Sequence, residues 1–436
     1  MTRRAQTRAL TARQPADGSA MVFGEREAAV YADQFEIYHG NANPDLAWKI
    51  CRYLGMEPGP VDVFKFANDN IFVKILDNVR EKDVFVVQPT SHPVNQSIME
   101  LLIMIDAFKR ASAGRITAVL PYYAYGRSDK KDQPRVPITA RLVADMISVA
   151  GADRVLTMDL HQGQIQGFFN IPVDELTAVH ILSNYFKHKH LEDLVVVTDL
   201  GFAKRARTFA ELLDAPLAII EKRRVGNLDR AELLNVIGEV RGKRAIIVDD
   251  EVDTAGTLIE TVNALAREGV TEIYACATHG VLSGAAVDRI GDSALRELVL
   301  TDTVPLPAGK RIAKITTLSI APLIGEAIKR IHRGESVGAL FSSEVEFTQE
   351  MLLWEDGIAR KLDIRVEPGR GDDGPEPPRL DGDPDEGPGS GGADDGGGST
   401  DDPSTHGPTE EPGGPNEDRP AAWVRQLATT RPGEDR

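Results

Sequence analysis

Short apolar runs alternate with stretches of helical periodicity between residues 35 and 341. Apolar runs bounded by turn residues are typical of buried strands, and the segments between them are long enough to form helices. The alternation favours an α/β fold in which mainly parallel sheets are covered by helices. The runs predict strands at residues 84–87, 116–120, 155–158, 194–197, 217–220, 245–248 and 273–277.

Residues able to do chemistry follow several of these predicted strands. In open α/β sheets, ligands bind beyond the carboxyl ends of the strands, so we expect these residues to converge on one or two clefts. They are residues 122–131 after one strand, Asp159 and His161 after the next, Thr198 and Asp199 after another, and Lys222, Arg223 and Arg224 after the strand at 217–220.

The segment 249–257, with the sequence DDEVDTAGT, carries the strongest chemical signal. It follows an apolar strand and leads into an amphipathic helix. The backbone N–H groups around Ala255 and Gly256, at the start of that helix, suit a phosphate dianion, and the hydroxyls of Thr254 and Thr257 can add donors. The segment therefore predicts a phosphate cradle.

Two adjacent carboxylates, Asp249 and Asp250, begin the same segment. Carboxylates accept hydrogen bonds from sugar hydroxyls or hold a hydrated Mg²⁺, so the segment suits a sugar phosphate. A second interpretation stays open at this point, because Asp or Thr at such a turn also serves simply to cap the next helix. The chain contains no Walker A loop, protein-kinase signature or nucleophile elbow.

The negative charge of the chain is concentrated near its C-terminal end. Of the formal net charge of -17, most comes from residues 366–420, which contain 16 acidic and 3 basic residues. The near-neutral remainder offers no clustered basic face, so we expect no nucleic-acid partner. Residues 366–436 are dense in Gly, Pro, Asp and Ser, which predicts a disordered acidic tail.

Residues 1–34 are predicted to be a flexible extension. The first twenty or so residues are rich in Arg and Ala without the continuous apolar stretch of a secretory signal; a transit peptide and a start at Met21 both stay open. We expect no membrane span, because no apolar run approaches the necessary length. The two cysteines, Cys51 and Cys276, lie far apart without metal-ligand neighbours, which fits a reduced, cytoplasmic protein.

Short motifs recur in order from about Ile37 to Ser343. They lie at residues 40–44, 99–102, 110–116, 159–161, 164–169, 249–257, 334–337 and 340–342. Together they resemble the ribose-phosphate diphosphokinase family, also called phosphoribosyl pyrophosphate (PRPP) synthetases. The resemblance implies the reaction in which ATP and ribose 5-phosphate give PRPP and AMP, with Mg²⁺ as cofactor.

The resemblance also implies a domain organisation. It predicts two tandem domains of the phosphoribosyltransferase type I-like fold, at residues 35–175 and 176–326, with the ribose 5-phosphate loop in the second. Residues 327–345 would pack back on the first domain, and residues 346–365 stay unassigned. It further implies a homo-oligomer, a hexamer or a dimer building block, with active sites shared between subunits.

Individual roles follow from the motifs that match. The residues expected to bind ribose 5-phosphate are Asp249, Asp250, Asp253, Thr254, Ala255, Gly256 and Thr257. Those expected to bind ATP are Phe66, Asn68, Asn70, Arg127, Ser128, Asp129 and His161, with Phe66 reaching the adenine of a neighbouring subunit. Those expected to hold Mg²⁺ are His161 and Asp199, and those expected to be catalytic are Lys222 and Arg224.

The chain departs from the family pattern in the nucleotide region. Asn68 and Asn70 stand where the family has carboxylates, Ser128 replaces a glutamine, and Phe202 stands where a glycine is usual. These changes keep open a catalytically weak, PRPP synthetase-associated regulatory protein, and a nucleobase phosphoribosyltransferase is a further alternative. The two-domain length and the presence of both Lys222 and Arg224 favour an active synthetase.

Overall fold

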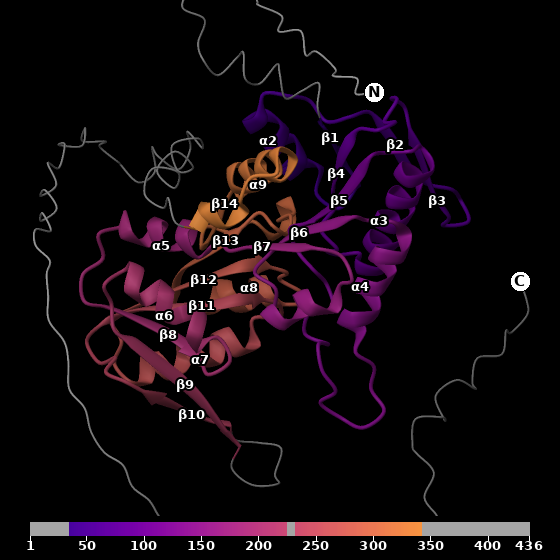
Figure 1. Cartoon of the computed structure of the whole chain (residues 1–436). Helices are drawn as coiled ribbons and strands as arrows, with labels where there is room; N and C mark the ends of the chain where they lie inside the picture. The colour runs from indigo at the N-terminus through magenta and orange to yellow at the C-terminus, as the bar shows by residue number, and fades with distance from the viewer. Residues whose placement is uncertain (1–34, 225–231, 342–436) are drawn as a thin grey trace, which may run out of the picture. The chain divides into compact units, whose positions relative to one another are not determined.

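A computed structural model of the chain describes residues 35–224 and 232–341 (Figure 1). The predicted N-terminal extension, the unassigned residues 346–365 and the predicted acidic tail lie outside the described residues.

The first sheet contains five strands, all parallel, in the order β1-β4-β5-β6-β7. Helix α2 packs against β1, and α3 packs against β4, β5 and the hairpin β2-β3. The strands and helices of this part are β1 (Phe35–His39), α2 (Pro44–Leu54), β2 (Val61–Lys65), β3 (Ile71–Ile75), β4 (Asp83–Val87), α3 (Val94–Arg110), β5 (Arg115–Leu120), α4 (Thr139–Ala150), β6 (Arg154–Met158), η1 (Gly163–Phe168) and β7 (Val173–Leu176).

The second sheet has seven strands in the order β10-β9-β8-β11-β12-β13-β14, and all its pairs except β10-β9 are parallel. Helix α6 packs against β8 and β9, and α7 packs against β11 and β12. Its elements are α5 (Val179–Lys187), β8 (Leu194–Asp199), α6 (Ala203–Leu212), β9 (Leu217–Arg224), β10 (Glu232–Ile237), β11 (Arg244–Val252), α7 (Gly256–Arg267), β12 (Glu272–Gly280), α8 (Ala286–Asp292), β13 (Leu295–Thr301), η2 (Ala308–Lys310), β14 (Ile315–Leu318), α9 (Ala321–Arg333) and η3 (Val337–Phe341).

Local sequence explains how these elements begin and end. Helix α2 starts after Asn43, whose side chain accepts a hydrogen bond from Leu46 N, and Pro44 stands in the first turn. The same helix ends at Gly55, which adopts a left-handed conformation with φ of 70°. Residues 245–248 of β11 form an unbroken, buried apolar run, which fits a central parallel strand buried on both faces.

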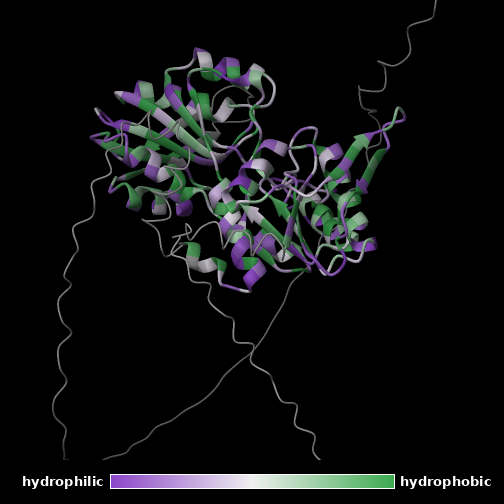
Figure 2. Ribbon diagram, turned by 90° about the horizontal axis from the view of Figure 1, so that it is seen from above, coloured by the Kyte–Doolittle hydropathy of each residue, from purple (hydrophilic) through white to green (hydrophobic). Residues whose placement is uncertain are grey.

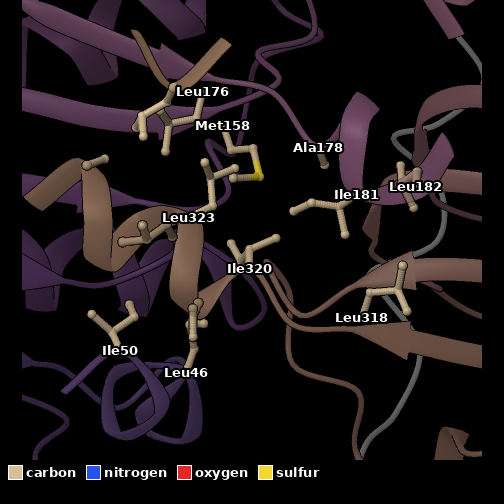
Figure 3. Close-up of a cluster of buried hydrophobic side chains, with 14 of the residues drawn as sticks. Leu46, Ile50, Met158, Leu176, Ala178, Ile181, Leu182, Leu318, Ile320 and Leu323 are labelled. Carbon is tan, nitrogen blue, oxygen red and sulfur yellow. The ribbon is translucent and has the colours of Figure 1, made fainter. Parts of the chain in front are cut away.

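One apolar cluster connects the two sheets (Figure 3). Helix α9 packs against α2, and side chains from both sheets and from α5 and α6 also belong to the cluster. Figure 2 shows hydrophobic colour along many strands and alternating hydrophobic and hydrophilic colour along the helices. The labelled members are Leu46, Ile50, Met158, Leu176, Ala178, Ile181, Leu182, Leu318, Ile320 and Leu323.

The predicted mainly parallel α/β fold is confirmed, and every predicted strand falls within an observed one. The apolar runs did not reveal β1, β2, β3, β7, β10, β13 and β14. The prediction that the residues able to do chemistry follow finished strands is wrong for three pairs. Thr198 and Asp199 lie inside β8, Asp249 and Asp250 inside β11, and Lys222 and Arg224 inside β9. Pairing with a neighbouring strand, as of Lys222 with Leu234 on β10, gives these backbones hydrogen-bond partners that apolar periodicity does not reveal.

The domain limits predicted at residues 35–175, 176–326 and 327–345 stay predictions. Among the helices of the described ranges, none is both long and apolar enough to cross a membrane. Cys51 and Cys276 are buried free thiols.

Candidate functional site

A cavity of about 260 Å³ lies at the carboxyl edge of the second sheet. Its walls come from the ends of β8 and β11 and the first turn of α7, together with two residues from beyond the strands of the first sheet, Arg127 and His161. The polar side chains lining it are Arg127, His161, Thr198, Asp199, Asp249, Asp250, Glu251, Asp253, Thr254, Thr257 and Thr261. The structure thus brings together residues that the sequence placed after separate strands.

The predicted phosphate cradle forms one wall of this cavity. Ala255 precedes α7 with φ of 60°, a conformation that non-glycine residues rarely adopt, and no side chain caps the helix. Two backbone carbonyls of the loop before α7 accept hydrogen bonds, Asp253 O from Ser283 N and Thr254 O from Arg289 Nη1, and these bonds fix the loop. The N-terminus of α7 therefore has no side-chain cap, which is the arrangement in which helix N-termini bind phosphate groups in other proteins.

Asp250 and His161 form an ion pair inside the cavity. His161 Nδ1 donates to Asp250 Oδ2 at 2.7 Å, and this hydrogen bond is the main cause of a raised His161 pKa. Burial opposes ionisation of Asp250, but the hydrogen bonds from His161 and Asp249 outweigh it and lower the Asp250 pKa to about 2. Asp250 is therefore an ionised carboxylate at neutral pH.

Asp249 has the opposite electrostatics. Burial, followed by repulsion from Asp250, raises its pKa well above the usual value. The Asp250 backbone N–H donates to Asp249 Oδ1 at 2.9 Å. The adjacent carboxyls thus differ in character, one charged and one with a strong preference for a proton or a cation.

The residues predicted to hold Mg²⁺ both line the cavity. Asp199 ends β8 with an exposed side chain whose Oδ1 accepts from Phe202 N at 2.9 Å. Because Asp250 engages Nδ1 of His161, the other ring nitrogen is the one suited to a metal. Among the described residues, no group of three or more His, Cys, Asp or Glu forms a ready-made metal site. A sparse donor set still fits Mg²⁺, which usually combines one or two carboxylates with substrate phosphates and water.

Arg127 reaches from the first sheet to the phosphate loop. Its Nη2 lies 3.3 Å from Glu251 Oε1, and its Nη1 lies 3.6 Å from Asp253 Oδ2. Glu251 is largely buried, and Tyr122 donates to its second oxygen at 3.4 Å. Burial raises the pKa of Glu251, and the guanidinium of Arg127 is the strongest opposing influence.

Behind the cavity, a buried network connects the two sheets. Asp159 directly follows β6 and has φ of 38°, and its Oδ2 accepts from Thr278 Oγ1 at 2.6 Å and from Ala178 N at 2.8 Å. His279 Nε2 donates to Asp159 O at 3.1 Å. Burial lowers the pKa of His279, so this ring stays neutral near neutral pH.

The predicted adenine-binding residues lie on a different part of the described chain. Phe66, Asn68 and Asn70 occupy the turn of hairpin β2-β3, where Asn70 N donates to Asn68 Oδ1 at 3.2 Å. The Phe66 ring is half exposed and packs against Phe72 at 5.6 Å. These residues are absent from the lining of the cavity.

The structure describes the remaining predicted residues to different extents. Ser128 and Asp129 follow Arg127 in the segment before α4, where Ser128 N donates to Tyr125 O, and neither lines the cavity in the described chain. Lys222 and Arg224 have described backbones at the end of β9, whereas their side chains lie outside the described residues. Their predicted roles stay predictions.

Sequence reasoning missed the residues that support the site. Glu251 stood inside the acidic motif, so the motif itself offered a signal for it. Tyr122 stood at the start of the range 122–131 that follows a predicted strand, but no role was assigned to it, and Thr278 offered no signal, because a Thr near a strand end has many structural uses. Their contacts cross between the two sheets, and only tertiary structure brings them together.

Comparison with known proteins gives matches over most of the described chain. A family profile described as the N-terminal domain of ribose phosphate pyrophosphokinase matches residues 35–151. A second profile, described as a phosphoribosyl synthetase-associated domain, matches residues 229–342.

Curated relatives and a solved structure agree with these profiles. The chain is 56% identical over 316 residues to a ribose-phosphate pyrophosphokinase of Caldanaerobacter subterraneus subsp. tengcongensis, covering 72% of this chain and 100% of the relative. It is 52% identical over 309 residues to that of Bacillus caldolyticus, covering 71% and 98%. The crystal structure of phosphoribosylpyrophosphate synthetase from Mycobacterium smegmatis is 42% identical with a TM-score of 0.66, covering 69% of this chain and 99% of that one.

Proposed function

The chain belongs to the ribose-phosphate pyrophosphokinase family, and from this premise we propose how its residues carry out the reaction. It transfers the diphosphoryl group of ATP to the C1 hydroxyl of ribose 5-phosphate, which gives PRPP and AMP. The observation that carries the proposal is one cavity with a helix N-terminus, two dissimilar carboxyls and cationic side chains from the other sheet.

The sugar phosphate binds to the second sheet. Its 5-phosphate accepts hydrogen bonds from the backbone N–H groups at the start of α7 and from the hydroxyls of Thr254 and Thr257. Asp249 and Asp250 accept hydrogen bonds from the ribose hydroxyls. Asp250 is suited to this role because it is ionised and fixed by His161.

The nucleotide binds on the side of the cavity formed by the first sheet. Arg127 and His161 contact the polyphosphate, and Ser128 and Asp129 extend this contact surface. Asp199 and His161 would hold Mg²⁺, which neutralises phosphate charge when it is bound. The C1 oxygen of the sugar then forms a bond to the β-phosphorus of ATP and its proton passes to solvent. The bond from that phosphorus to the bridging oxygen of the α-phosphate breaks, and AMP leaves with the bonding electron pair.

Lys222 and Arg224 supply cations for the charge that develops during transfer. Their position on β9, next to the strand that ends in Asp199, supports this role. Preorganised donors aimed at developing charge contribute on the order of 3 kcal/mol each to lowering the barrier.

We also propose that the active site is completed by a second copy of the chain. The support is hairpin β2-β3, where the exposed rings of Phe64 and Phe66 pack against each other at 5.3 Å. Such rings suit an adenine base, yet they are absent from the cavity lining of their own chain. A homo-oligomer, hexamer or dimer building block, would bring Phe66, Asn68 and Asn70 to the nucleotide of a neighbouring subunit, and mass photometry of the purified chain tests this.

The purified chain tests the main proposal directly. It is incubated with ATP, Mg²⁺ and ribose 5-phosphate, with and without inorganic phosphate, while AMP and PRPP are followed. Formation of both products in equal amounts is expected. Consumption of PRPP with a nucleobase would instead indicate a phosphoribosyltransferase, and inertness in every mixture would indicate a regulatory protein. A cytoplasmic location belongs to the same proposal, since both cysteines are free thiols.

A further inference from the structure

Glu251 lies at the point where the two sheets meet the cavity, and no role was expected for it from the sequence. It sits on β11, between Asp250 and the phosphate loop, and its side chain is 9% exposed. A buried carboxylate is costly unless it is paired and hydrogen-bonded. Its partners therefore indicate what it does.

Both carboxylate oxygens of Glu251 are engaged by groups from the first sheet's side of the cavity. Oε1 lies 3.3 Å from Arg127 Nη2, and Oε2 accepts from the Tyr122 hydroxyl at 3.4 Å. The Tyr122 ring is itself fixed, since it packs edge-on against His279 at 5.1 Å. His279 is the neighbour of Glu251 in the register of β11 and β12.

Arg127 has two acidic neighbours, and its ion pairs with them differ in strength. Asp253 is 32% exposed and lies 3.6 Å away, and such solvated pairs hold a side chain weakly. The Glu251 contact is shorter and more buried, so it restricts the guanidinium more. Arg127 itself is 49% exposed and would otherwise sample many orientations.

We propose that Glu251 is a positioning residue, which holds Arg127 over the junction between the sugar-phosphate loop and the nucleotide. This inference rests on the proposed function, because it assigns Arg127 to the polyphosphate. Glu251 touches neither substrate in this proposal. It restricts the orientation of the Arg127 side chain before ATP binds, so that less conformational entropy is lost on binding.

A double-mutant cycle tests the proposal. Glu251→Ala is expected to raise KM for ATP about tenfold, with KM for ribose 5-phosphate changed less than about twofold. In an Arg127→Ala background, Glu251→Ala is expected to add less than about a twofold further change, because its effect passes through Arg127. Glu251→Gln, which keeps one acceptor oxygen for Arg127 and replaces the other oxygen by an NH2 group that can donate to the Tyr122 hydroxyl, is expected to fall between wild type and Glu251→Ala.

The matched control is Glu260→Ala, on the exposed face of α7 and outside the cavity lining, which leaves both KM values unchanged. An unchanged or lower KM for ATP in Glu251→Ala would overturn the proposal, as would an equal effect in both backgrounds. Should Glu251→Ala fail to fold, Glu251→Gln takes its place in the cycle. If the wild type forms no PRPP, the proposed function fails; if it forms PRPP and the cycle shows no coupling, only the role of Glu251 fails.

Discussion

At the scale of single residues, the surroundings of two chemically identical side chains in the site shift their pKa values in opposite directions. Asp249 and Asp250 are adjacent in sequence, yet His161 holds one as a carboxylate while burial and repulsion favour a proton or a cation on the other. The pairing partner comes from the far side of the cavity. The role of each carboxyl is therefore set by what faces it.

Asp250→Asn is predicted to weaken ribose 5-phosphate binding. The substitution removes the ionised carboxylate that fixes His161 and accepts hydrogen bonds from the sugar hydroxyls. The KM for ribose 5-phosphate should therefore rise about tenfold or more. Steady-state kinetics at saturating ATP measures this. Asp292→Asn at the exposed end of α8 serves as the control, and an unchanged KM in Asp250→Asn would contradict the assignment.

Lys222→Ala is predicted to lower turnover by roughly a hundredfold or more, because it removes a cation aimed at the developing charge. Folding should change little, as judged by circular dichroism and thermal unfolding. The control is Lys187→Ala on the exposed surface of α5. Turnover near that of the wild type in purified Lys222→Ala would remove the catalytic role from Lys222.

At the scale of secondary structure, side-chain networks fix helices to the sheet. Glu297 on β13 accepts from Tyr185 Oη at 2.6 Å and from Thr316 Oγ1 at 2.6 Å, and pairs with Lys189 at 2.7 Å. Burial opposes ionisation of Glu297, but these hydrogen bonds, led by Lys189, outweigh it and lower its pKa. The network joins α5 and Lys189, two residues beyond its end, to β13 and β14.

Glu297→Gln is predicted to lower the free energy of unfolding by about 1–3 kcal/mol at neutral pH. Since the folded-state pKa lies below the unfolded value of about 4.3, the stabilisation is present above that pH and is lost as the pH falls through the folded-state pKa. Urea titrations of both proteins at equal concentration should show their difference shrinking in acid. Glu211→Gln on the exposed side of α6 should show no such difference, and a pH-independent gap for Glu297→Gln would contradict the prediction.

At the scale of the whole molecule, the described chain places one site on two sheets. Asp159 adopts a positive φ of 38°, which costs on the order of 1 kcal/mol and persists because Thr278 and His279 of the second sheet hold it. His161 follows two residues later. The network thus determines how the two sides of the cavity face each other.

Thr278→Val is predicted to reduce both stability and activity, because it removes a buried hydrogen bond to Asp159 while keeping the side-chain shape. The loss of stability should be about 1–3 kcal/mol, and turnover should fall about tenfold through misplacement of His161. Denaturant unfolding and kinetics on the same preparation measure the two effects. Thr208→Val on the exposed side of α6 is the control; a stability loss with unchanged turnover would show that the network does not position His161.

The amino-acid sequence by itself determined the α/β class and the strands with the most apolar sequences, and it predicts a phosphate site in the loop at residues 249–257. These depend on local periodicity and on short motifs, which a linear chain displays directly. It overlooked β1 and β7, which carry charged or polar residues, and it ended β9 too early because the pairing with β10 is not local.

Only the tertiary structure decided which strand ends meet. His161 and Asp250 are far apart in the chain, as are Asp159 and Thr278, and no sequence spacing relates them. Packing of α9 on α2 and the shared apolar cluster bring the two sheets together. The motif therefore predicts a class of ligand, and the packing of one sheet beside the other decides which side chains surround the motif.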